Sequence, residues 1–178
     1  MSTELHRPRV SAFLALSLDG FIAGEGGDLA WLEPYNGDSQ DETGYSALMA
    51  STDTLLMGRN SYDTVLGFPE WFYGDKPVVV LTHRPAAPRE HVSFRQGALA
   101  QVLDELWQAG SRHLYLDGGE LVRQGLQAAL VDELILFWVP VTLGRGVPLF
   151  AGQLPGALVP VSSSVLPSGL VRVVYQSA

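Results

Sequence analysis

Two stretches of this chain decide its fold, and each is a short apolar run that ends in glycine and then becomes helical in pattern. The first is Thr54-Leu-Leu-Met-Gly58-Arg59-Asn60-Ser61-Tyr62, and the second is Leu116-Asp117-Gly118-Gly119-Glu120-Leu121. Glycine lets the backbone approach a ligand closely, and the free N–H groups at a helix N-terminus attract anions. Two such turns, with an arginine on the first, predict a ligand with two phosphates, such as a nicotinamide dinucleotide.

Outward from these turns, apolar strand-like runs alternate with helical segments as far as residue 141. Strands are expected at Val10–Leu18, Phe21–Ala23, Thr54–Met57, Val78–Leu81, Val92–Phe94, His113–Leu116 and Glu133–Val141. Helices are expected at Ser39–Ser51, Asn60–Leu66, Leu99–Ala109 and Glu120–Leu130. The strand-like runs Val161–Leu166 and Leu170–Tyr175 indicate a terminal antiparallel hairpin. We therefore predict an α/β fold: a mostly parallel central sheet with helices on both faces and an antiparallel hairpin at its end.

Composition indicates one globular domain over residues 1–178, with a flexible N-terminus at 1–9. The 178 residues are 47% hydrophobic, and their net charge of −8 disfavours nucleic acid and anionic membranes as partners. Cysteine is absent, which excludes disulfides and thiolate metal sites. The four histidines show no metal-ligand spacing, so we expect no metal. No apolar run reaches the ~18 residues of a membrane span, and we expect a cytoplasmic enzyme.

Five motifs occur in an order that resembles the dihydrofolate reductase-like superfamily. They are Ser17-Leu-Asp-Gly-Phe-Ile-Ala23, Asp53-Thr-Leu-Leu-Met-Gly-Arg59, Val79-Val-Leu-Thr82, Asp117-Gly-Gly119 and Pro140-Val-Thr-Leu-Gly-Arg-Gly-Val-Pro-Leu-Phe150. The order is most similar to the RibD C-terminal family, the reductase domain of the riboflavin-biosynthesis deaminase–reductase. The resemblance implies a three-layer dihydrofolate reductase-like fold, an NADPH-dependent reductase and a homodimer.

The resemblance also implies which residues hold NADPH. The phosphates would lie at the two glycine turns, the adenosine end over the segment Leu81–Arg84, and the nicotinamide against the first strand. Arg59 and Arg84 are the candidates for the 2′-phosphate. The implied cofactor-binding residues are Ala15, Ile22, Gly58, Arg59, Ser61, Thr82, His83, Arg84, Gly118, Gly119, Glu120 and Leu121.

Several of these side chains have a plain structural alternative. Arg59 could pair with Asp63 one helical turn later, and exposed pairs of this kind contribute little stability. Asp19 could serve only as a turn residue before Gly20, or it could face the nicotinamide as a catalytic group. Glu42 could complete a capping box with Ser39, or it could be the carboxylate that holds and helps protonate a pterin-like ring.

The substrate side is acidic and aromatic. Trp31 and Tyr45 are expected to line the substrate pocket, although Trp31 could instead anchor its glycine-rich loop. Residues 24–52 contain no lysine or arginine, and such a surface suits a ribose phosphate poorly. Reduction of a riboflavin intermediate, as in 5-amino-6-(5-phosphoribosylamino)uracil reductase, therefore competes with reduction of a pterin. A cofactor-binding module without turnover is a third alternative.

Overall fold

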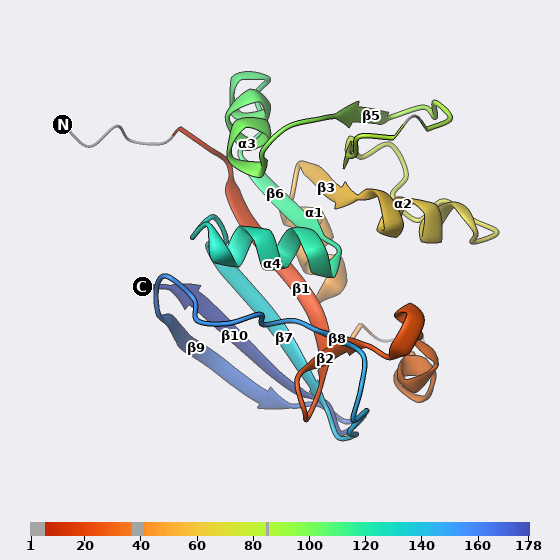
Figure 1. Ribbon diagram of the computed structural model, residues 1–178, viewed down its shortest axis with the longest axis vertical. Coiled ribbons are helices and arrows are strands. Elements are labelled where there is room, and N and C mark those ends of the chain that lie inside the picture. Colours follow the sequence, from red (N-terminus) through yellow and green to blue (C-terminus); the bar gives the residue numbers. More distant parts are fainter. Residues whose placement is uncertain (1–5, 37–40, 85) are drawn as a thin grey trace.

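The computed structural model describes residues 6–36, 41–84 and 86–178, and a twisted sheet runs through the middle of it (Figure 1). Eight strands of the described chain form this sheet, in the order β5-β4-β3-β6-β1-β7-β10-β9. Their bounds are β1 (Arg9–Ser17), β3 (Thr54–Gly58), β4 (Val78–Leu81), β5 (Val92–Arg95), β6 (His113–Asp117), β7 (Glu133–Val139), β9 (Leu158–Val165) and β10 (Val171–Ser177).

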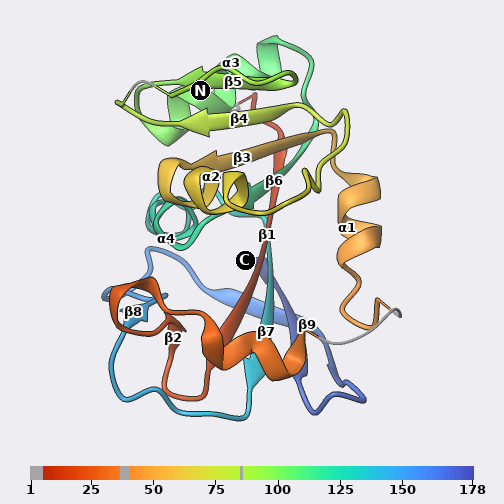
Figure 2. The same ribbon diagram turned by 90° about the vertical axis from the view of Figure 1, so that its right-hand side faces the viewer.

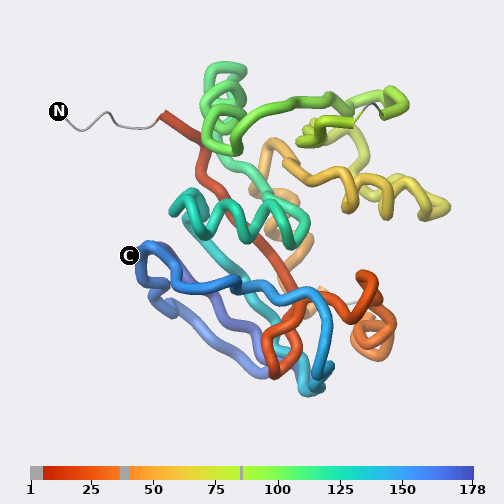
Figure 3. Tube along the Cα trace, in the orientation of Figure 1, coloured from red at the N-terminus to blue at the C-terminus, as the bar shows by residue number. Residues whose placement is uncertain are grey.

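The sheet is parallel from β5 to β7, and the C-terminal hairpin of β10 and β9 joins it antiparallel. β1 lies at its centre, between β6 and β7, as the red tube in Figure 3 shows. Parallel strands need crossover connections, and helices supply those between β3 and β4, β5 and β6, and β6 and β7. The helices are α1 (Tyr45–Ser51), α2 (Arg59–Leu66), α3 (Leu99–Gln108) and α4 (Gly119–Gln127).

Two apolar clusters, one on each face of the sheet, form the core. Side chains alternate between the faces along each strand. On β7, Leu134 and Leu136 pack on the face covered by α3 and α4, whereas Ile135 and Phe137 pack on the face of α1 and α2. Figure 2 shows α4 and α1 on opposite sides of the sheet. The predicted arrangement of helices on both faces is therefore confirmed.

Helix α1 begins later than the sequence predicts. Ser39 lies outside the described residues, and the described chain becomes helical only at Tyr45, so Glu42 stands in a turn before the helix. The Asp41 carboxylate takes the capping role instead: it accepts the backbone N–H groups of Tyr45 at 3.1 Å and Ser46 at 2.5 Å. Glu42 does not stand in the first turn of α1 and so completes no capping box there, and the Ser39 half of that prediction lies outside the described residues.

Helix α4 ends at Gln127, three residues before its predicted end. Ala129 adopts a left-handed φ of 54°, and the Leu130 N–H donates to the Gly125 carbonyl at 2.8 Å. This left-handed residue ends the helix, a role that glycine usually takes. Alanine takes the left-handed position here, so the sequence contained no glycine or proline at residue 129 to indicate where the helix ends.

A second, two-stranded sheet was not predicted. It pairs β2 (Phe21–Ala23) with β8 (Val147–Pro148). Gly146 makes the pairing possible, because a Cβ atom at its φ of 145° would overlap the Ala23 carbonyl oxygen. The glycine-rich loop after β2 contains two short 3₁₀ helices, η1 (Glu25–Gly27) and η2 (Ala30–Tyr35). Among the described residues, no helix is long and apolar enough to span a bilayer.

Candidate functional site

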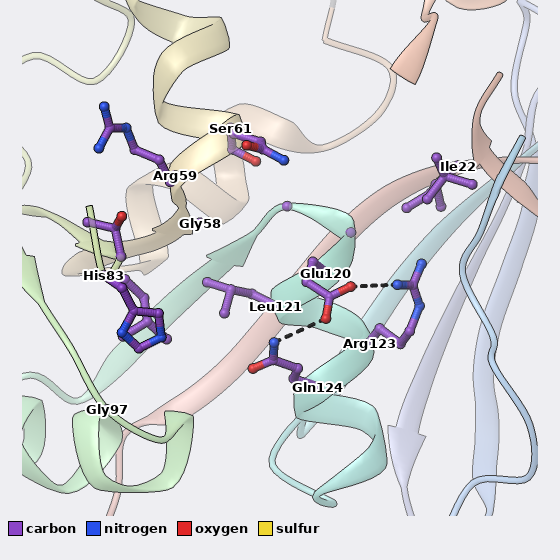
Figure 4. Close-up of a pocket in the computed structure, with 16 residues that line it drawn as sticks. Ile22, Gly58, Arg59, Ser61, His83, Gly97, Glu120, Leu121, Arg123 and Gln124 are labelled. Carbon is purple, nitrogen blue, oxygen red and sulfur yellow. Dashed lines mark hydrogen bonds and ion pairs between the residues drawn. The ribbon is translucent and has the colours of Figure 1, made fainter. Parts of the chain in front are cut away.

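A cavity of about 510 Å³ opens where β3, β4 and β6 end and where α2 and α4 begin (Figure 4). Its volume is in the usual range for small-molecule sites. The parallel strands end at the same edge, so the two predicted glycine turns lie side by side there. The lining residues are Ile22, Gly58, Arg59, Asn60, Ser61, Leu81, Thr82, His83, Gly97, Gly118, Gly119, Glu120, Leu121, Arg123, Gln124 and Val147.

The second turn has no room for a side chain. Gly118 has φ 97° and ψ 128°, a conformation that other residues rarely adopt. A Cβ atom on it would lie 2.5 Å from Ser61 Oγ, and a Cβ atom on Gly119 would overlap the end of the Ile22 side chain. The turn therefore brings bare backbone to the cavity beside the first N–H groups of α4, which have no partner within the helix.

Arg59 reaches the cavity from the first turn of α2, and its side chain is 20% exposed. Its Nε donates to Asp63 at 2.8 Å, and Nη1 donates to the Arg84 carbonyl at 3.1 Å. The pairing with Asp63 considered from the sequence therefore exists, and it orients the guanidinium. Arg84 itself is 63% exposed, lies 3.9 Å from Asp63, and is not among the residues that line the cavity.

A network on α4 forms the opposite wall. Glu120 accepts hydrogen bonds from Arg123 at 2.6 Å and from Gln124 at 3.1 Å (Figure 4). Arg123 also donates to the carbonyls of Pro148 and Leu149. Arg123 thus ties the segment after β8 to the helix, and Val147 completes the wall.

Ten of the twelve predicted cofactor residues line this cavity; Ala15 and Arg84 do not. Leu81, at the start of the segment expected beneath the adenosine end, lines it as well. Sequence reasoning missed the other five lining residues: Asn60, Gly97, Arg123, Gln124 and Val147. Asn60 lies within the first glycine motif, and Arg123 and Gln124 follow Gly119 by about one helical turn. Their helical spacing could have identified them, whereas Val147 enters only through the pairing of β8 with β2.

Ala15, Trp31 and Tyr45 lie on the α1 face of the sheet, in one aromatic cluster. Phe13 packs against Phe137 with ring centres 4.7 Å apart, and Tyr45 packs against Phe13 at 5.5 Å. Trp31 Nε1 is buried, and no partner for it is found among the described residues. A buried donor without a partner loses its hydration, which is costly unless a ligand or water accepts its hydrogen bond.

Asp19 holds a turn. Its carboxylate accepts the Ser17 hydroxyl at 2.6 Å, the Leu143 N–H at 3.0 Å and the Gly144 N–H at 2.7 Å. The Ser17 hydroxyl and these backbone donors lower the pKa of Asp19 to about 2. Asp19 is therefore ionised at neutral pH and connects the end of β1 to the segment before β8.

Asp117, which precedes the two glycines, is the acidic group that sequence reasoning missed. Its carboxylate accepts the Gly118 N–H at 2.8 Å, and burial raises its pKa. Some of the residue stays accessible, but protein surrounds the carboxyl group closely enough for desolvation to dominate. Burial and the charge of Asp117 also raise the pKa of Tyr45 to about 12. An acid directly before the glycine pair was a signal in the sequence, but its burial was not.

Comparison with known proteins assigns the chain to one family. A model of the RibD C-terminal domain matches residues 8–171. The Bacillus subtilis protein YwjB is 37% identical over 141 residues, which is 78% of this chain and 80% of YwjB. A proposed riboflavin biosynthesis protein from Shewanella sp. PV-4 is also 37% identical, and its crystal structure matches with a TM-score of 0.82 over 96% of this chain and 99% of that one.

The fold extends to more distant proteins. Dihydrofolate reductase from Enterococcus faecalis, in a complex with NADP(H), matches with a TM-score of 0.62 over 95% of this chain and 96% of that one. At 18% identity this likeness shows the fold alone. The predicted dihydrofolate reductase-like fold is confirmed.

Proposed function

The chain belongs to the RibD C-terminal domain family, and from this premise we propose that it is an NADPH-dependent reductase acting on a small heterocyclic molecule. The observation that carries the proposal is the cavity at the two glycine turns, with bare backbone at Gly118–Gly119 and the N-termini of α2 and α4 facing it. Helix N-termini and close backbone approach suit a pyrophosphate.

The residues present fit the cofactor. In this proposal the glycine turns and Ser61 hold the two phosphates, Arg59 holds the 2′-phosphate, and Thr82 and His83 contact the adenosine end. Arg84 would contribute only by moving toward the cavity, since it lies outside the lining. Ile22 packs across Gly119, and with Ala15 it would orient the nicotinamide. The bound nicotinamide supplies the hydride, and the protein supplies position and a proton.

For the proton, we propose Asp117 in preference to Asp19. Asp117 directly precedes the cavity turn and accepts the N–H of Gly118, which lines the cavity, and burial favours the protonated form that a general acid needs. Asp19, with its pKa near 2, has no proton to give at neutral pH and acts as a positioning residue for the 143–144 turn. Glu42, in the turn before α1, is the alternative donor.

Nucleotide binding tests the cofactor assignment directly. NADPH at about 100 times its Kd should stabilise the protein by about 2.7 kcal/mol, which corresponds to roughly 5–10 °C in melting temperature for a chain of this size. Gly119→Ala should reduce this shift, because its Cβ displaces Ile22 into the site. Gly156→Ala is the matched control, since a Cβ there meets open space. A wild-type protein that no nicotinamide nucleotide stabilises would contradict the proposal, and binding without NADPH oxidation would favour a module without turnover.

We also propose a homodimer. β9 is an eight-residue edge strand, and Val165 on it is 75% exposed, with Val159 and Val161 about half exposed. An exposed apolar edge strand favours association. Light scattering at micromolar concentration should give twice the chain mass, and a monomer would refute the proposal.

A further inference from the structure

The α1 face of the sheet carries Arg172 at a defined place in the row of strands. Ala15 of β1 pairs with Phe137 of β7, and Phe137 pairs with Arg172 of β10. Two strand spacings separate Ala15 from Arg172, which is roughly 10 Å. A molecule whose reducible atom lies beside Ala15 could therefore extend across Phe137 to the Arg172 side chain.

The guanidinium of Arg172 is fixed in place. Its Nε donates to the Thr43 carbonyl at 3.1 Å, and a Cβ on Gly44 would lie 3.7 Å from Nη2. The arginine thus spans from β10 to the residues just before α1. In Figure 2 the lower, N-terminal end of α1 is directed toward the C-terminal hairpin, which is far from it in the sequence, and the Arg172–Thr43 hydrogen bond joins the two segments.

Arg172 differs from the other arginines in what it contacts. Seven of the ten arginines pair with carboxylates: Arg7, Arg9, Arg59, Arg84, Arg95, Arg123 and Arg145. Arg89 and Arg112 lie over the rings of Trp71 and Trp107. Within the described residues, Arg172 has neither a carboxylate nor a ring, and its two terminal nitrogens have no hydrogen-bond acceptor.

Arg172 is half-buried, and its terminal nitrogens are not fully buried: the side-chain atom of the described chain that is fully buried without a partner is Trp31 Nε1. Asp41, two residues before the Thr43 carbonyl that Arg172 binds, accepts hydrogen bonds from the Thr43 hydroxyl and from the backbone N–H groups of Tyr45 and Ser46. Among the described residues no carboxylate forms an ion pair with Arg172, so this half-buried cation is available to an anion from outside.

We propose that Arg172 binds an anionic oxygen group, a phosphate or a carboxylate, on the end of the substrate opposite the reduced atom. The inference rests on the proposed reductase function and names the substrate class of the same site: a heterocycle with an acidic tail. A distant strand thus supplies the positive charge that residues 24–52 lack. The planar guanidinium forms two parallel hydrogen bonds with an oxyanion, which gives both affinity and orientation.

Matched pairs of probes test the proposal by calorimetry with NADPH present. One pair is an aminopyrimidine riboside with and without its 5′-phosphate, and the other is a dihydropterin with and without a carboxylate tail. The wild type should bind at least one anionic member more tightly than its neutral partner, and the pair that does so identifies the tail. Arg172→Met should weaken that member about 10- to 100-fold, as expected for losing a charged hydrogen bond, and should leave the neutral member unchanged.

Controls separate this role from a structural one. Arg9→Met makes the same change of charge at the far end of β1 and should change neither probe. Arg172→Lys keeps a donor for Thr43 and should retain part of the preference, which keeps the test valid if Arg172→Met is unstable. Equal losses for both members of a pair, or no anionic preference in the wild type, would overturn the proposal. Failure to bind NADPH, with the preference intact when the probes are titrated alone, would refute only the cofactor assignment.

Discussion

Replacing Gly118 with alanine should destabilise the protein, and the structure separates two causes. The first is backbone strain: φ 97° and ψ 128° lie in a region that is nearly restricted to glycine, and the cost is about 1–3 kcal/mol. The second is the new Cβ, which would lie 2.5 Å from Ser61 Oγ. Because this oxygen can rotate away, its displacement costs only about 0.5–1.5 kcal/mol. The sum is about 2–4 kcal/mol, or roughly 5–15 °C in melting temperature.

A double-mutant cycle with Ser61→Ala distinguishes the two causes. Without Oγ, the nearest Ser61 atom to the new Cβ is its own Cβ at 3.6 Å, an ordinary contact. Urea unfolding of the four proteins should therefore recover at most about 1.5 kcal/mol in the double variant. Gly156→Ala, in open space, should stay within about 0.5 kcal/mol of wild type. A stable Gly118→Ala protein, or full recovery in the double variant, would refute the argument from backbone strain.

Three further outcomes follow from the site. Arg59→Ala should weaken NADPH about 10- to 100-fold and leave NADH within about twofold in titrations, whereas equal losses would place Arg59 at the pyrophosphate. Asp117→Asn should lower turnover by a factor of about 10²–10⁴. The activity of the wild type should fall as pH rises through the raised pKa of Asp117. A fully active Asp117→Asn variant would return the role of proton donor to Glu42. Asp19→Asn should lower the free energy of unfolding at neutral pH, as measured in unfolding assays. The ionised carboxylate contributes stability that is lost only as pH falls below 3.8 toward 2. An unchanged free energy of unfolding at pH 7 would contradict this.

The glycine turns and strands were predictable from the sequence because their determinants are local. Apolar runs that break at Gly58 and Gly118 mark the strand ends and helix starts, and β4 has the same bounds in the structure as in the prediction. The terminal hairpin was also predicted, since a proline–serine–glycine turn joins two alternating runs. These signals place most of the cavity, because parallel strands must end at the same edge.

Features that depend on distant pairing were not predictable. Val147 lines the cavity only because Gly146 lets β8 approach Ala23, and nothing near residue 147 indicates that partner. The start of α1 was misplaced because both Ser39 and Asp41 are good capping residues, and the sequence does not decide between them. The charge of Asp117 raises the pKa values of Tyr45, Tyr73 and Tyr115, which come from three separate segments, so the buried environment that raises the pKa of Asp117 has no local signature in the sequence.

The arrangement of charge would let an acidic protein bind both the proposed cofactor and a substrate with an anionic tail. On the cofactor side, the arginines Arg59 and Arg123 are each paired with a carboxylate, so they add little net positive potential. The pyrophosphate there would depend mainly on backbone N–H groups, which are fixed dipoles independent of the chain's net charge, and Arg59 would add the contact to the 2′-phosphate. On the substrate side, Arg172 stands without a carboxylate among the described residues and would act through its full charge. Backbone dipoles therefore suit an invariant cofactor, whereas one unpaired guanidinium suits the selection of a substrate by its tail.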